Sequence, residues 1–289
     1  GQSQDVESVG GFIRLWTTRN QRWLSPKYLC GESYGSFRAA ALADHLHNRY
    51  GMYLNGVVLL SGTLDFATLK QGGESYLGHL AYLPTYTAVA HYHGKLPPDL
   101  QEDREKALAE AHAFAEGAYA LALLRGNALA EDEREEIADQ LARLTGLSPD
   151  LVKDSNLRVD SARFREYLLR DQDLVVGRFD GRTTGRDADR ASPMPRFDPS
   201  YHAAYGPFAA AMNDYVRREL QFTNDLPYQI LAGVRPRSNE AKNSHPSVTA
   251  QLGSVMSKNP HMRVLVLGGL CDLACPIDGI RHSLDHMRL

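Results

Sequence analysis

The stretch Lys27-Tyr28-Leu29-Cys30-Gly31-Glu32-Ser33-Tyr34-Gly35-Ser36 decides the fold expected of this sequence. Residues 27–30 have the short apolar pattern of a buried strand, and residues 36–49 have the alanine-rich, amphipathic pattern of a helix. Between them lies a G-x-S-x-G motif, in which a serine occupies a sharp turn from strand to helix. We expect glycine at 31 and 35 because a Cβ at either position would be crowded in this strained turn. The motif therefore predicts an exposed serine hydroxyl at the end of a strand.

The rest of the chain predicts a sheet interrupted by a helical insertion. A helix is expected around Val6–Thr18, and strands are expected at 56–61 and 261–269, the latter as a continuous buried strand inside a parallel sheet. Between them the pattern changes to helices, expected at 100–124, 132–145, 161–169 and 201–219, with a long loop at 177–199. We therefore expect core at residues 1–83, an inserted helical cap at 84–231 and a return to core at 232–289.

Composition excludes several classes of protein. With 43% hydrophobic residues, 23% charged residues and a formal net charge of −3, the chain has a globular composition and gives no indication of nucleic-acid binding. No apolar run is long enough to span a bilayer. The three cysteines do not form a disulfide framework and are expected to be free thiols. No glycine run has the spacing of a dinucleotide site, so no cofactor is expected.

A candidate acid follows the last predicted strand. Asp272 lies just after a glycine-rich turn at that strand's end, where catalytic groups gather in parallel sheets, and it is placed to orient a histidine. The alternative is that Asp272 only caps a turn or helix, and Asp278 and Asp285 are weaker candidates. The order of Ser33 then Asp272 agrees with the order Ser, Asp, His of α/β-hydrolases. The prediction is an incomplete α/β-hydrolase core, with a mostly parallel sheet and an inserted helical cap.

Several segments together resemble the serine carboxypeptidase family, particularly its bacterial members. The resemblance runs over nearly the whole chain and is carried by residues 12–15, 20–23, 31–35, 55–59, 83–87 and 272–276. It implies a peptidase that removes C-terminal residues through an acyl-enzyme, with Ser33 as nucleophile and Asp272 as triad acid. It also implies that the backbone N–H of Tyr34 contributes to the oxyanion hole and that Glu32 recognises the substrate's terminal carboxylate. A periplasmic or secreted location is implied as well.

Two features of that family have no counterpart in the sequence. The family's triad histidine follows the acid by several tens of residues, whereas His282 and His286 have helical spacing and are expected to form one exposed helix face. The family's Asn-Gly-Gly-Pro-Gly segment, which completes the oxyanion hole, is also absent. We therefore expect a fragment of a larger enzyme, poorly stable or inactive alone. The alternatives are another α/β-hydrolase, such as an esterase or aminopeptidase, and a non-catalytic binding protein on the same fold.

The remaining polar clusters do not predict further sites. His91-Tyr92-His93 has the His-x-His spacing of some metal sites, but no third ligand is evident, so no metal is expected. The arginines spaced every four residues from Arg178 to Arg190 are nearly balanced by aspartates, which argues against a phosphate or nucleic-acid stripe. The expected partner is a peptide substrate. The sequence does not indicate the oligomeric state or the side-chain preference.

Overall fold

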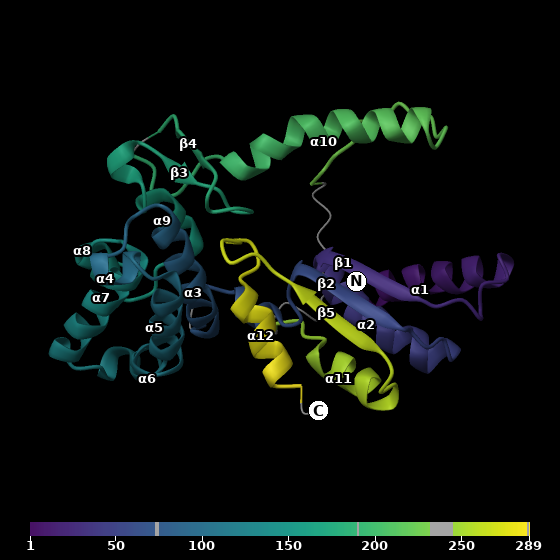
Figure 1. The fold of residues 1–289 in the computed structure, drawn as a ribbon, viewed down its shortest axis with the longest axis horizontal. Coiled ribbons are helices and arrows are strands. Elements are labelled where there is room, and N and C mark those ends of the chain that lie inside the picture. Colours follow the sequence, from purple (N-terminus) through teal and green to yellow (C-terminus); the bar gives the residue numbers. More distant parts are fainter. Residues whose placement is uncertain (73–74, 190, 232–244, 288) are drawn as a thin grey trace.

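The computed structural model describes residues 1–72, 75–189, 191–231, 245–287 and 289, and it is an α/β protein with a three-stranded parallel sheet and many helices (Figure 1). Strands β1 (Tyr28–Ser33), β2 (Gly56–Gly62) and β5 (Arg263–Leu267) lie in the order β1-β2-β5. Both strand pairs are parallel, as the sequence predicts. The ends of all three strands therefore meet at one edge.

One face of the sheet is covered by helices. Helix α2 (Tyr34–Tyr50) packs against β1 and β2, while α1 (Gln2–Arg19) and α11 (Thr249–Lys258) pack against α2. Val57 and Leu59 of β2 point into the core that this layer forms, where both are almost fully buried. Burial of these apolar side chains is the main force that holds α2 on the sheet.

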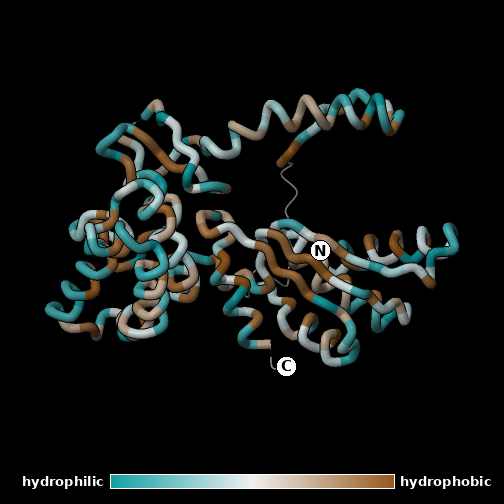
Figure 2. The backbone as a smooth tube through the Cα atoms, in the orientation of Figure 1, coloured by the Kyte–Doolittle hydropathy of each residue, from teal (hydrophilic) through white to brown (hydrophobic). Residues whose placement is uncertain are grey.

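The opposite face of the sheet is open along much of its length. Tyr28 and Cys30 of β1 and Leu60 of β2 are exposed, and Leu265 and Leu267 of β5 are 52% and 45% exposed. The prediction of a continuous buried strand at 261–269 is therefore wrong. Within the described sheet β5 is an outer strand, and its side chains alternate between the covered and the open face. Figure 2 shows the apolar strands that form this face.

A block of helices stands beside the sheet and has its own apolar core (Figure 1). It comprises α3 (Leu77–Tyr92), α4 (Pro98–Gln101), α5 (Arg104–Glu116), α6 (Ala118–Arg125), α7 (Glu131–Thr145), α8 (Pro149–Asp154) and α9 (Ser161–Tyr167). The predicted helix at 100–124 is thus divided among three helices. It breaks at Asp103 (φ −136°, ψ 101°) and at Gly117 (φ −114°, ψ −109°), where the backbone is not helical.

Helix α3 crosses residues 83 and 84, where the boundary of the cap was expected. Pro84 lies inside the helix rather than at its start, although proline removes a backbone donor and normally breaks or kinks a helix. The helix is buried over most of its length, including Leu83 and Val89. Helix α3 packs against α5, α7, α12 (Ile277–Asp285) and the 3-10 helix η1 (Phe66–Leu69). This packing offsets the loss of the backbone hydrogen bond that Pro84 cannot donate.

The chain leaves the helical block through a small hairpin and a long helix. After the 3-10 helix η3 (Arg170–Gln172), strands β3 (Val175–Val176) and β4 (Thr184–Gly185) pair in an antiparallel manner, and β4 lies within the region predicted as a loop. Helix α10 (Pro199–Arg218) then extends away from the block, and its Phe208 is 66% exposed (Figure 1). The expected return to core at residue 232 lies outside the described residues. In the part of the chain that is described, no helix is both long and apolar enough to cross a bilayer.

Candidate functional site

Ser33 occupies the turn that the G-x-S-x-G motif predicts. It is the last residue of β1 and the N-cap residue of α2, it is exposed, and its backbone has φ 54° and ψ −122°. A non-glycine residue with positive φ is uncommon and strained, and such residues concentrate at functional sites. The turn places Ser33 at the edge where the three strand ends meet.

The two glycines of the motif differ in their surroundings. A Cβ on Gly31 would lie 1.9 Å from the carbonyl oxygen of Gly35, so the turn has no space for a side chain there. A Cβ on Gly35 would meet no atom within 4 Å, so the expectation of crowding at Gly35 is wrong. Gly35 lies in the first turn of α2, where a side chain has open space. Ser36 fixes the turn from the helix side, because its Oγ donates to the carbonyl of Gly31 at 2.8 Å.

Ser61 lies at the end of the neighbouring strand and was not expected to belong to the site. Glu32 pairs with Leu60 and Ser33 with Gly62, so Ser61 is an extra residue that forms a bulge. It has φ 41°, and its hydroxyl donates to Oδ2 of Asp272. Its position at a parallel strand end was the available signal in the sequence, because functional side chains gather at such ends.

Asp272 is buried in the loop after β5, with 6% of its surface exposed. Its Oδ1 accepts hydrogen bonds from the backbone N–H of Ala274 at 2.8 Å and of Cys275 at 3.0 Å. Burial raises the pKa of Asp272, and the hydrogen bond from Ser61 opposes this rise. The carboxylate therefore does cap a turn. Its two oxygens offer about four acceptor positions, so a further donor can still bind.

Glu32 and Cys275 form the immediate surroundings of Ser33 and Asp272. Partial burial, followed by the charge of Asp272, raises the pKa of Glu32. Cys275 is buried, and this burial raises the pKa of its thiol to about 12, while the Ser33 hydroxyl partly offsets the rise. Each shift extends the pH range over which the group is neutral.

The side chain of Tyr34 points away from this cluster. Its hydroxyl donates to Oδ2 of Asp5 in α1 at 3.1 Å, and Arg38 also binds Asp5. Burial is the main reason why the pKa of Tyr34 rises to about 12. The backbone N–H of Tyr34 lies in the first turn of α2, where N–H groups have no partner within the helix. The side chain of Ser33 makes no capping hydrogen bond to this turn.

No histidine forms a hydrogen bond with Ser33 or Asp272 within the described residues. Asp278, a weaker candidate for the acid, instead accepts from Nε2 of His112 at 3.0 Å, which links α12 to α5. His282 of α12 and His286, the C-cap residue of that helix, lie one turn apart with ring centroids 4.1 Å apart. The two histidines share one helix face, as their spacing predicts, but His282 is partly buried while His286 is exposed. Asp285 is exposed on the same helix.

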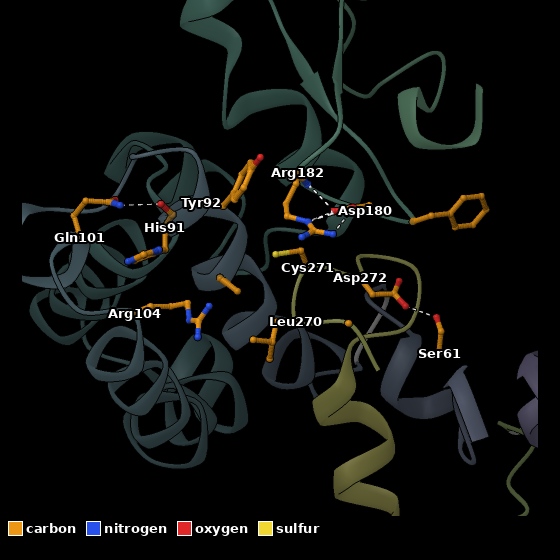
Figure 3. A pocket seen from close by; sticks show the side chains of 13 residues that line it. Ser61, His91, Tyr92, Gln101, Arg104, Asp180, Arg182, Leu270, Cys271 and Asp272 are labelled. Atoms are coloured by element: carbon orange, nitrogen blue, oxygen red, sulfur yellow. Dashed lines mark hydrogen bonds and ion pairs between the residues drawn. The ribbon is translucent and has the colours of Figure 1, made fainter. Parts of the chain in front are cut away.

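A cavity of about 870 Å³ opens beside Asp272, between the end of the sheet and the helical block (Figure 3). Ser61 and Asp272 lie on one side, and residues of α3, α4 and α5 lie on the other, including His91 and Arg104. The β3–β4 connection contributes Phe179, Asp180 and Arg182 to the lining of the cavity.

The polar groups in the described residues do not converge on a metal ion. No group of three or more histidine, cysteine, aspartate or glutamate side chains is arranged to hold one in the described parts of the chain. In the His91-Tyr92-His93 segment, Nε2 of His93 lies 2.8 Å from the carbonyl of Gly181. Comparisons with protein-family models, curated proteins and solved structures found no match.

Proposed function

We propose that the chain carries the nucleophile and the acid of a serine-type peptidase on an α/β-hydrolase core, acting as a serine carboxypeptidase. The observation that carries this proposal is the backbone of Ser33, with φ 54° and ψ −122°, at the junction of β1 and α2. This strand, strained serine and helix form the arrangement that a nucleophile elbow requires. The buried Asp272 at the end of β5 supports the same assignment.

Each residue then has a chemical role. Ser33 attacks the last peptide carbonyl, a histidine base takes its proton and returns it to the leaving amine, and Asp272 holds that histidine in the required tautomer. The backbone N–H of Tyr34 stabilises the oxyanion. No histidine of the described residues bonds to Ser33 or Asp272. Under this proposal the base is therefore a histidine that none of these hydrogen bonds identifies.

Glu32 has the properties expected of a group that reads a carboxylate. Its pKa is raised by partial burial and by Asp272, so it stays protonated to a higher pH than an ordinary glutamate. A protonated carboxyl can donate a hydrogen bond to the terminal carboxylate of a peptide, whereas an ionised one repels it. Binding of free-acid peptides should therefore weaken as the pH rises through the pKa of Glu32.

A serine-directed phosphonate tests the assignment of Ser33. In the protein that contains the base, we expect it to label Ser33, labelling to disappear in Ser33→Ala, and labelling to persist in Ser257→Ala, whose hydroxyl in α11 bonds to the carbonyl of Gly253. In the same protein, Asp272→Asn should reduce turnover by about 10⁴, as loss of the orienting acid does in triads. Persistent labelling of Ser33→Ala would show that another residue is the nucleophile.

Peptides with free and amidated C-termini test Glu32. Under this proposal Glu32→Gln flattens the alkaline decline in binding of the free-acid peptide and leaves the amide largely unaffected. An identical response of both peptides to pH and to Glu32→Gln argues against a carboxypeptidase and favours an esterase or aminopeptidase on the same fold.

The second candidate is a non-catalytic peptide-binding protein on this fold. The observation that favours it is the lack of a hydrogen bond between any described histidine and Ser33 or Asp272, which a working triad requires. For this candidate, the protein binds peptides with equal affinity before and after Ser33→Ala, and the phosphonate labels neither protein. Labelling of Ser33 eliminates it.

A further inference from the structure

The cavity beside Asp272 is built from three segments that hydrogen bonds hold together. The N–H of Gly181 donates to the carbonyl of Cys271 at 2.8 Å, which joins the β3–β4 connection to the loop after β5. His93 of the helical block contacts the carbonyl of the same Gly181 at 2.8 Å. The cavity is therefore a fixed feature of the junction, and its volume of about 870 Å³ lies within the usual range for ligand sites.

The end of the cavity away from Asp272 carries an excess positive charge. Arg182 is neutralised by Asp180, to which its Nε and Nη2 donate at 2.9 and 2.8 Å. Among the described residues, Arg104, the first residue of α5, pairs only with its neighbour Glu105, at 3.3 Å, and the two side chains are 54% and 84% exposed. Such exposed pairs hold a guanidinium weakly. Figure 3 shows Arg104 directed towards Leu270 and Cys271, into the cavity.

Helix α4 and an apolar wall complete this end. The amide of Gln101 donates to the backbone carbonyl of His91 at 2.8 Å, which fixes the position of α4 against the end of α3. Ala88 and Leu270 line the same cavity and provide its apolar surface. The arrangement suits a short aliphatic stem that ends in an anionic group.

We propose that this cavity binds an acidic side chain of the substrate, an aspartate or glutamate next to the bond that is cleaved, with Arg104 as its main partner. The inference rests on the proposed peptidase function, since it places a substrate residue beside Ser61 and Asp272. A guanidinium binds a carboxylate through two parallel hydrogen bonds. The amide of a glutamine or the ammonium group of a lysine in the ligand cannot accept both of these bonds. Arg104 is thus a specificity-determining residue rather than a catalytic one.

Binding of short peptides to the whole chain with Ser33→Ala tests this proposal without hydrolysis. The probes are N-acylated dipeptides that carry glutamate, glutamine or lysine at the last or the next-to-last position, measured by isothermal titration. At one of these positions glutamate should bind about tenfold more tightly than glutamine, and the ratio should fall with added salt. In Arg104→Gln the ratio should fall to about one, and Arg104→Glu should favour lysine. Arg125→Gln is the control, because Arg125 is an exposed arginine of α6 outside the cavity.

The outcomes separate this inference from the proposed function. A glutamate preference that is absent, or that survives Arg104→Gln, overturns the inference even if the phosphonate labels Ser33. A preference that depends on Arg104 in a protein whose Ser33 is never labelled upholds the cavity as an acidic-peptide site and refutes the peptidase. If Arg125→Gln abolishes the preference as strongly as Arg104→Gln, the effect reflects overall charge and the inference fails.

Discussion

The helical block and the sheet region bury their apolar side chains to different extents. In the block, α3 is packed by other helices, and Leu83, Val89 and Leu100 are almost fully buried. In the sheet region one face is packed by α2 while the other leaves Leu265 and Leu267 about half exposed. The block can be stabilised by its own core, whereas the sheet depends on a single layer of helices. The candidate site lies between them, at the edge of the less protected region.

The turn at Ser33 should be the most sensitive point of the sheet region. Gly31→Ala should lower the free energy of unfolding by more than about 4 kcal/mol, because a Cβ there would lie 1.9 Å from a backbone oxygen that cannot move without distorting the turn. The control, Gly35→Ala, should change it by less than about 1 kcal/mol, since alanine fits the open space and favours helix. Urea denaturation measures both. Equal losses would mean that the turn is not packed as described.

Two leucine substitutions compare the two regions directly. Leu100→Ala should cost about 2–5 kcal/mol, because Leu100 is fully buried in the helical block and its removal leaves a cavity. Leu265→Ala on the open sheet face should change stability by no more than about 0.5 kcal/mol. Thermal or urea unfolding of each variant provides the comparison. A loss at Leu265 as large as that at Leu100 would show that the open face is covered in solution.

The smallest effect is expected at the ion pair that joins the regions. Asp278 is the main cause that raises the pKa of His112, and burial and Arg281 oppose it. A raised pKa means that the pair stabilises the protein at pH values below the ordinary histidine pKa, and that this contribution disappears as the pH rises through the raised pKa. His112→Gln should therefore lower stability by about 0.5 kcal/mol at pH 5.5 and by almost nothing at pH 9.

Unfolding at both pH values measures this difference. His202→Gln is the matched control, because the ring of His202 contacts a backbone carbonyl and no carboxylate. A His112→Gln effect that is constant across the pH range would show that His112 acts through packing, and not through its charge.

Local features of the site were predictable from the sequence, while features that depend on packing were not. The strand, the Ser33 turn and α2 are adjacent in the chain, so residue pattern and turn chemistry are sufficient to predict them. The exposure of β5 depends on which elements cover it, and the course of α3 through Pro84 depends on burial that no local pattern records. The cavity brings together Ser61, Arg104 and Asp272, which are too far apart in sequence for any spacing rule to connect.

Helix α3 also limits how the two regions can move. It packs against α5 and α7 on one side and against η1 and α12 on the other, so it is a shared structural member rather than a tether. A rigid rotation of the helical block would carry α3 with it and press on α12, which begins directly after the loop of Asp272. The cavity would then widen and the Asp272 carboxylate would shift in the same motion. Any ligand that spreads the junction would alter the geometry at Ser61 and Asp272 without touching either residue.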